Sequence, residues 1–167
     1  LLGELGINKL YAVIGGSMGG MRALQWAVSF PEFVDRCVCV ASAAHLNTQA
    51  LAFDVIGRGE IEQDPNWCNG DYYDNDAKPD QGLARARQIG HVMRARFGRE
   101  KRNEPWPGQK SQFSTDFQVE SYLAYQGQKF VNRFDANSYL YVTHMMDMFD
   151  LPAEHGGLDK ALASVKS

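Results

Sequence analysis

A serine framed by glycines is the feature that most constrains this chain. Residues 13–20 read Val-Ile-Gly-Gly-Ser-Met-Gly-Gly, with Ser17 at the centre of a G-x-S-x-G pattern. An apolar run precedes the pattern and a stretch with helical spacing follows it, which is the context in which it forms a nucleophile elbow. Gly15 and Gly19 would allow a tight turn, and the two other glycines of the segment a closer backbone approach. We expect Ser17 to adopt a strained backbone conformation with an exposed, activated hydroxyl. A glycine-rich turn that only packs or binds an anion is the alternative.

The residues around Ser17 predict a strand, a helix and a second strand. Residues 9–14 form a short and largely apolar segment, which is typical of a buried parallel strand. Residues 18–30 carry apolar side chains at helical spacing and end before a proline, and residues 36–41 form a second buried run. Together they predict a right-handed βαβ unit whose functional loop lies at the carboxyl end of the first strand. Residues 1–6 resemble the end of a helix closed by Gly6.

The remainder of the chain is predicted to be helical. After residue 47 no strand is evident, a turn-rich loop occupies residues 66–81, and residues 99–115 are polar and irregular. The expected helices cover residues 48–63, 82–96, 117–130, 136–149 and 158–165. The fold class is therefore α/β, with a partial core over residues 1–46 and a helical lid over residues 47–167 that leads back toward further core strands.

Composition excludes several classes of function. The 167 residues are 44% hydrophobic and 22% charged, with a net charge of −3, so the charge gives no support for binding nucleic acid or an anionic membrane. No apolar run is long enough to cross a bilayer and no signal peptide is evident. Cys37, Cys39 and Cys68 have no metal-ligand spacing, and we interpret them as reduced, buried thiols of a cytoplasmic protein that holds no metal. Cys37 and Cys39 are two residues apart on a predicted strand, so their side chains should point to the same face.

A nucleophilic serine needs a histidine base and a carboxylate that orients it. Asp150 and His155 are five residues apart and offer a triad with Ser17, but this fold normally delivers the two groups from separate strand ends, so we do not favour it. The backbone amide of Met18, at a helix N-terminus, is placed to stabilise an oxyanion. Arg85 and Arg87 could each bind a substrate carboxylate, and spacing leaves a surface role open for both. The residues thus predict a nucleophile without its base.

Five segments carry a resemblance to a known family. They read AVIGGSMGGMRALQWAVSFPEFV, VASAAHLNTQALAFDVI, DPNWCNGDYY, GLARARQIGH and VESYLAYQGQKFVNRFDANSYLYVTHMMDMFDL. In this order they resemble the homoserine O-acyltransferases of the α/β-hydrolase superfamily, over nearly the whole chain. The resemblance implies an α/β-hydrolase fold with a helical lid, and a homodimer assembled through that lid.

The resemblance also implies a reaction. Ser17 would take an acetyl group from acetyl-CoA, which acts as a substrate and not as a bound cofactor, and pass it to the hydroxyl of L-homoserine in methionine biosynthesis. Arg87 would hold the amino-acid substrate. The family's catalytic Asp and His would lie beyond Ser167 and its second oxyanion loop before Leu1, so the chain would be an internal fragment. Relative to the family, a piece of lid helix after His91 is expected to be deleted.

Several alternatives remain open at this point. The elbow does not separate acyl transfer from hydrolysis, so an esterase is the first alternative. A succinyl donor and a serine acceptor also fit. A third possibility, from another class, is that the 167 residues alone are catalytically inert, with exposed strand edges.

Overall fold

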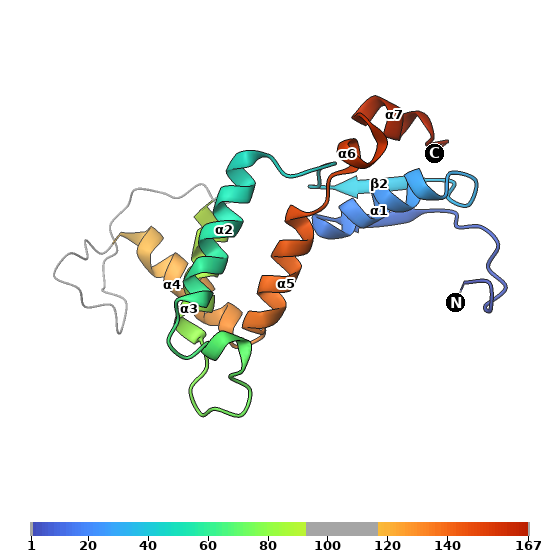
Figure 1. Ribbon diagram of the computed structural model, residues 1–167. Helices are drawn as coiled ribbons and strands as arrows, with labels where there is room; N and C mark the ends of the chain where they lie inside the picture. The colour runs from blue at the N-terminus through green and yellow to red at the C-terminus, as the bar shows by residue number, and fades with distance from the viewer. Residues whose placement is uncertain (1, 93–116, 167) are drawn as a thin grey trace. The chain divides into compact units, whose positions relative to one another are not determined.

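The computed structural model describes residues 2–92 and 117–166, which fall into two compact units (Figure 1). Unit 1 consists of Leu1–Thr48 and His144–Ser167, and unit 2 of Gln49–Thr143. Unit 2 is thus an insertion in the sequence of unit 1. The elements in chain order are β1 (Val13–Gly16), α1 (Met18–Ser29), β2 (Cys37–Val40), α2 (Thr48–Glu62), η1 (Cys68–Gly70), α3 (Asp80–Val92), α4 (Gln118–Val131), α5 (Ala136–Asp147), α6 (Leu151–His155) and α7 (Leu158–Ala163).

Unit 1 is built on a parallel pair of strands joined by a helix. β1 and β2 pair in parallel, with Gly15 opposite Cys39 and Gly16 opposite Val40. α1 connects the two strands and packs on them. Its buried residues include Ala23 and Ala27, whose small side chains let the helix backbone approach the sheet. The predicted βαβ order is therefore confirmed, with the functional loop between β1 and α1.

A pairing within unit 1 joins the segment that leaves it to the segment that returns. His45 and Asp150 form an isolated antiparallel bridge, and the Leu151 amide donates to the Ala44 carbonyl at 3.0 Å. We call these residues, 44–45 and 150–151, the neck. Leu151 is fully buried and packs with Val28 of α1. The neck is thereby fixed to the core of unit 1.

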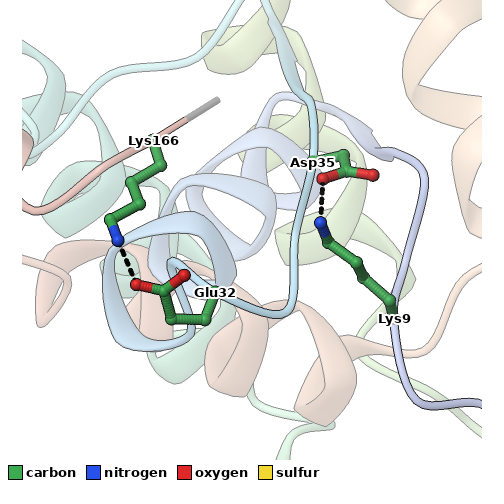
Figure 2. A network of polar contacts seen from close by, with 4 residues as sticks. All are labelled: Lys9, Glu32, Asp35 and Lys166. Carbon is green, nitrogen blue, oxygen red and sulfur yellow. Dashed lines mark hydrogen bonds and ion pairs between the residues drawn. The ribbon is translucent and has the colours of Figure 1, made fainter.

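Surface ion pairs link other segments of unit 1. In Figure 2, Lys9 reaches Asp35, and Lys166 near the C-terminus reaches Glu32 after α1. All four side chains are exposed, Asp35 the least at 41%. Exposed pairs of this kind contribute about 0–1 kcal/mol each, so they add little to the stability of this unit.

Unit 2 is helical, and glycines bring its helices close together. A β carbon at Gly82 of α3 would lie 2.4 Å from the Glu60 carbonyl oxygen of α2. One at Gly127 of α4 would lie 3.0 Å from the Ala84 carbonyl oxygen of α3. Larger residues would force these helices apart. The core beneath these crossings consists of Ile61, Tyr72, Leu83, Ala86, Phe130 and Ala136.

Several predictions need correction. Residues 2–6 form consecutive turns that end at Gly6 with φ 69°, and not a helix, because their backbone hydrogen bonds join residues three apart, Leu5 to Leu2 and Gly6 to Gly3. The short helix α6 was not predicted. The first strand begins at Val13 and runs into the glycines, with only a bridge between Leu10 and Val34 before it. Residues 144–167 cluster with unit 1, whereas we expected them to belong to the helical lid.

The sheet of unit 1 has one open face among the described residues. Ile14, Val38 and Val40 lie on it and are exposed, Ile14 by 71%. The other face carries Cys37 and Cys39 toward α1, yet Cys37 is only partly buried and Cys39 is exposed, as is Cys68. The expected burial of the thiols is therefore not found for Cys39 and Cys68 in the described part of the chain, and is only partial for Cys37. No helix of the described part of the chain is both long and apolar enough to span a bilayer.

Candidate active site

Ser17 occupies the junction between β1 and α1 in a strained conformation. Its φ is 54° and its ψ is −122°, a region that favours glycine. Its amide donates to the Val40 carbonyl of β2 at 2.9 Å, and its carbonyl accepts from the amides of Gly20 and Met21 in the first turn of α1. Ser17 is therefore held by the sheet on one side and by the helix on the other. The strained backbone expected at the elbow is confirmed.

The Ser17 hydroxyl is exposed and is not used as a helix cap. Serine at an N-cap normally accepts a hydrogen bond from an amide of the first turn. Ser17 is the N-cap of α1, but its side chain makes no such bond. Ser17 is exposed, so its uncapped hydroxyl is accessible.

Two of the four glycines at the elbow are required by close contacts. A β carbon at Gly15 would lie 1.9 Å from the Gly19 carbonyl oxygen, and one at Gly20 would lie 2.5 Å from Cβ of Ser42. At Gly19 nothing lies within 4 Å, and at Gly16 the nearest atom is 3.9 Å away. The expected steric role holds for Gly15 and Gly20. It is not seen for Gly16 and Gly19, where a side chain has room.

Met18 is the first residue of α1, where backbone amides have no partner within the helix. Its amide is adjacent to the strained serine and shares the positive end of the helix dipole. This is the location in which an amide can stabilise negative charge on an oxygen bonded to Ser17. The site so far therefore offers a candidate nucleophile and one candidate oxyanion donor.

A cavity of about 340 Å³ lies beside this helix in unit 1. Sequence reasoning did not single it out, although the methionines at helical spacing in α1 and α5 were a signal. Its lining comes from α1 and from the segment that follows residue 143, and consists of Met18, Met21, Arg22, Gln25, His144, Met145, Met148, Phe149 and Glu154. The Met18 side chain thus borders a mainly apolar cavity whose polar lining residues are Arg22, Gln25, His144 and Glu154.

The Asp150–His155 pair does not form a catalytic arrangement. The Asp150 carboxylate accepts from the Ala153 amide at 2.9 Å and caps α6, whose last residue is His155. Within residues 2–92 and 117–166, no hydrogen bond joins these two side chains. Among the other histidines, His91 lies in α3 with its ring edge-on to Tyr122, which matches a packed helix residue. No histidine of the described residues hydrogen-bonds to the Ser17 hydroxyl, although His144 lines the same cavity as Met18.

Arg85 and Arg87 of α3 have different surroundings. Arg85 is 62% exposed and pairs with Glu60 at 3.5 Å, so it belongs to the surface. Arg87 is partly buried, and its guanidinium carbon lies 4.6 Å from the centre of the Phe130 ring. Stacking on an aromatic ring fixes the plane of a guanidinium. Arg87 belongs to unit 2 and Ser17 to unit 1, and each is described within its own unit.

Two of the segments that carry the family resemblance meet in unit 2. Asn137 of α5 accepts from Trp67 Nε1 at 3.0 Å and donates to the Gly70 carbonyl at 2.8 Å. Asp135 accepts hydrogen bonds from the hydroxyls of Tyr72 and Tyr73. We call these residues the loop clamp, because they attach the loop after α2 to the start of α5. Sequence reasoning did not assign them a role.

Ionisation in the loop clamp favours charged Asp135 and neutral Tyr72. Burial alone raises the pKa of Asp135, but hydrogen bonds from Tyr72, Ser138 and Tyr73 outweigh it and hold the pKa below its ordinary value. Burial, and then the hydrogen bond to Asp135, raises the pKa of Tyr72. At neutral pH, Asp135 is therefore charged and accepts the hydrogen bond, and Tyr72 is neutral and donates it. In the described parts of the chain, no group of three or more His, Cys, Asp or Glu side chains could hold a metal ion.

Comparison with known proteins places this geometry in a family. The family model described as the alpha/beta hydrolase fold matches residues 1–162. The chain belongs to the α/β-hydrolase fold family. Its strand, strained serine and helix have the arrangement that a nucleophile elbow has in this fold.

Relatives and solved structures within this family include transferases and esterases. Homoserine O-acetyltransferase of Methanocorpusculum labreanum is 47% identical over 174 residues, which cover 100% of this chain and 35% of that protein. The X-ray structure of homoserine O-acetyltransferase from Bacillus anthracis matches with a TM-score of 0.82 and 26% identity, over 99% of this chain and 45% of that one. The crystal structure of esterase E22 matches with a TM-score of 0.80 and 29% identity, over 99% and 46%. The chain thus spans less than half the length of the proteins it matches.

The expected deletion after His91 falls largely on residues 93–99, outside the described residues.

Proposed function

We propose that the whole protein transfers an acetyl group from acetyl-CoA to the hydroxyl of L-homoserine through an acetyl-serine intermediate on Ser17. The observation that carries this proposal is the strained, uncapped Ser17 at the start of α1. It is supported by the 47% identity to a homoserine O-acetyltransferase along the entire chain.

The chemistry follows from the elbow. Ser17 Oγ attacks the thioester carbonyl, and the Met18 amide stabilises the oxyanion that forms. The bond to sulfur breaks and the CoA thiol leaves, and the homoserine hydroxyl then attacks the acetyl-serine ester by the same route in reverse. The Asp150 carboxylate is engaged in capping α6. We therefore assign the histidine base and its orienting carboxylate to residues outside this chain.

We assign recognition of the amino-acid acceptor to Arg87. A free carboxylate is bound best by a planar guanidinium that donates two parallel hydrogen bonds. Stacking on Phe130 fixes that plane before the substrate arrives, whereas Arg85 is exposed and paired with Glu60. The acceptor would therefore be an amino acid with a free carboxylate.

Incubation of the whole protein with acetyl-CoA, with and without homoserine, tests the proposal. We expect a burst of one CoA per active site without homoserine, and sustained release together with O-acetylhomoserine when it is added. Ser17→Ala should remove both, and mass spectrometry should find the acetyl group on the peptide that contains Ser17. Sustained CoA release that does not depend on homoserine would contradict acyl transfer.

Hydrolysis is the second candidate, because esterase E22 shares the fold with a TM-score of 0.80. Water and homoserine compete for the same acetyl-serine, so the elbow geometry fits both reactions. Simple acetate esters separate them: an esterase releases acetate at a rate that added homoserine does not change. Succinyl-CoA in the same assay, and L-serine as acceptor, test the two substrate alternatives.

The remaining parts of the proposal concern the cell and the assembly. We propose a cytoplasmic protein of methionine biosynthesis that forms a homodimer through its helical unit. It would bind neither nucleic acid nor a membrane. Light scattering on the whole protein should give twice the mass of one chain. The isolated 167 residues should have negligible turnover, because they would lack the base.

A further inference from the structure

Two thiols lie side by side on β2. Cys37 and Cys39 are two residues apart, so their side chains point to the same face of the strand. Their sulfur atoms are 3.6 Å apart. Cys39 is exposed and Cys37 is partly exposed, and Cys39 Sγ also donates to the Gly20 carbonyl at 3.3 Å. The pair is therefore accessible and lies at the first turn of the nucleophile helix.

The spacing of the sulfurs suits a bridging atom better than a direct bond. A disulfide requires about 2.05 Å between sulfurs, and positions two apart on a strand have Cα atoms about 6.4–6.8 Å apart, the upper end of the range that disulfides tolerate. A pyramidal trivalent centre with two bonds to sulfur of about 2.3 Å, a length like that of a zinc–thiolate bond, holds the sulfurs about 3.3–3.5 Å apart. The observed 3.6 Å is close to this separation, so the two side chains need to move little.

The pair offers only two sulfur ligands, and this number limits which atom can bridge them. A structural zinc ion requires four protein ligands. The described residues offer no group of three or more His, Cys, Asp or Glu side chains, so two thiolates are all this place provides. A trivalent atom that already carries one organic group needs only two further bonds, and the two sulfurs can supply them.

We propose that Cys37 and Cys39 form a dithiol site that binds a trivalent arsenical carrying one organic group. In the hydrated arsenical, two As–O bonds break and two As–S bonds form. Each thiol proton leaves with one hydroxyl group, so that two waters are released. Arsenic remains trivalent and neither sulfur is oxidised, so the step needs no oxidant or reductant.

The protonation state of Cys37 affects which reagents the pair reacts with. Burial, and then the neighbouring Cys39, raises the pKa of the Cys37 thiol to about 11. A thiol that stays protonated at neutral pH reacts slowly with reagents that need a thiolate. In chelation, the first As–S bond brings the arsenic to the second thiol, so the second bond forms within the molecule. The pair should therefore prefer chelation to simple alkylation.

Occupation of the site also affects the elbow. Cys39 pairs across the strands with Gly15 and donates its proton to the carbonyl of Gly20. A bond to arsenic removes that proton and the hydrogen bond. On the basis of the function proposed above, the arsenical should slow acetylation of Ser17, but binding itself is tested separately.

The test uses the whole protein, fully reduced and treated with one equivalent of phenylarsine oxide. Digestion and mass spectrometry should locate one phenylarsenic group on the peptide that contains both Cys37 and Cys39, with two hydrogens lost. The adduct should survive a wash with a monothiol and be removed by a dithiol such as dimercaptopropanol. An adduct on any other peptide, or one that a monothiol removes, would overturn the proposal.

Three single variants provide the matched controls. Cys37→Ser and Cys39→Ser should each lower the adduct that survives the monothiol wash roughly 10²-fold, because a single thiol gives no chelate. Cys68→Ser should leave it unchanged, since Cys68 lies in the loop of unit 2. Full retention in either variant of the pair would contradict the site. If a variant fails to fold, the peptide map of the unaltered protein still decides the outcome.

Discussion

Ser17 is held in a backbone conformation that serine does not favour. Its φ of 54° and ψ of −122° are stabilised by the sheet hydrogen bond to Val40 and by the first turn of α1. Strain of this kind costs about 1–3 kcal/mol, and glycine removes it while adding flexibility to the unfolded chain. We predict that Ser17→Gly raises the free energy of unfolding by about 1 kcal/mol. Chemical denaturation of the whole protein measures the change.

The matched variant for Ser17 is alanine. Ser17→Ala removes the hydroxyl but keeps the β carbon, so it should leave the strain and the stability nearly unchanged. Both variants should lack CoA release. If Ser17→Ala stabilised the protein as much as Ser17→Gly, the strain would not be the cause.

Arg87 and Arg85 allow a paired test on one helix. Arg87 stacks on Phe130, while Arg85 lies at the surface. Loss of a charge-assisted bidentate contact costs roughly 3 kcal/mol, so we predict that Arg87→Ala lowers kcat/KM for homoserine roughly 10²-fold. Arg87→Lys should recover little, because a lysine donates as a point charge. Steady-state kinetics with Arg85→Ala as control should show a change of less than about twofold for that residue.

The turn between β1 and α1 depends on one glycine more than on its symmetric partner. A side chain at Gly15 would meet the Gly19 backbone at 1.9 Å, whereas nothing lies within 4 Å of one at Gly19. We predict that Gly15→Ala destabilises the protein by more than about 3 kcal/mol or prevents folding. Gly19→Ala should change stability by less than about 1 kcal/mol, since alanine also favours a helix. Thermal unfolding distinguishes them, and equal losses would contradict the geometry.

The loop clamp is the second element whose contribution can be measured. Asn137 satisfies both the Trp67 ring N–H and the Gly70 carbonyl. Asn137→Ala leaves these groups without a partner, and we predict a loss of about 2 kcal/mol in unfolding free energy. Gln128→Ala is the control, because that amide makes one exposed bond on α4 and should cost less than about 0.5 kcal/mol. Urea titration of both variants provides the comparison.

Alkaline pH should destabilise both units of the molecule. The pKa of Cys37 in unit 1 is raised from 9.0 to about 11, and that of Tyr72 in unit 2 is raised above its ordinary 10.0. In each case the unfolded chain loses its proton first. The stability is therefore complete below pH 9 and declines as the pH rises toward and beyond 11.

Melting temperatures measured from pH 8 to pH 11 test this decline. Cys37→Ser should flatten the part that begins near pH 9, and Tyr72→Phe the part that begins near pH 10. Tyr141→Phe is the control, because that side chain is exposed and lies outside the loop clamp. A decline that persists unchanged in both variants would assign it to other groups.

At the scale of the whole molecule, the sequence predicts local motifs and helices better than it predicts contacts between residues far apart in the chain. The elbow was found because its glycines and the helical spacing after it are local signals, and the predicted helix 48–63 ends one residue beyond α2. α6 was missed because it has only five residues, although Asp150 as cap and Pro152 in the first turn could have indicated it. The Trp67–Asn137 contact joins residues 70 apart, and no local pattern reveals such a pair. The exposure of Cys39 likewise depends on which elements flank a strand.

The neck has a consequence for how such a molecule can diversify. Because residues 44–45 pair with residues 150–151 inside unit 1, the two ends of the insertion are fixed without help from unit 2. Bringing the two ends of a long insertion together costs conformational entropy, and the contacts of unit 1 at the neck offset that cost. Another helical insertion joined at the same neck would therefore keep the Ser17 elbow and replace the helical unit to which we assign recognition of the acceptor. Relatives with one elbow can in this way come to differ in substrate while they share their chemistry.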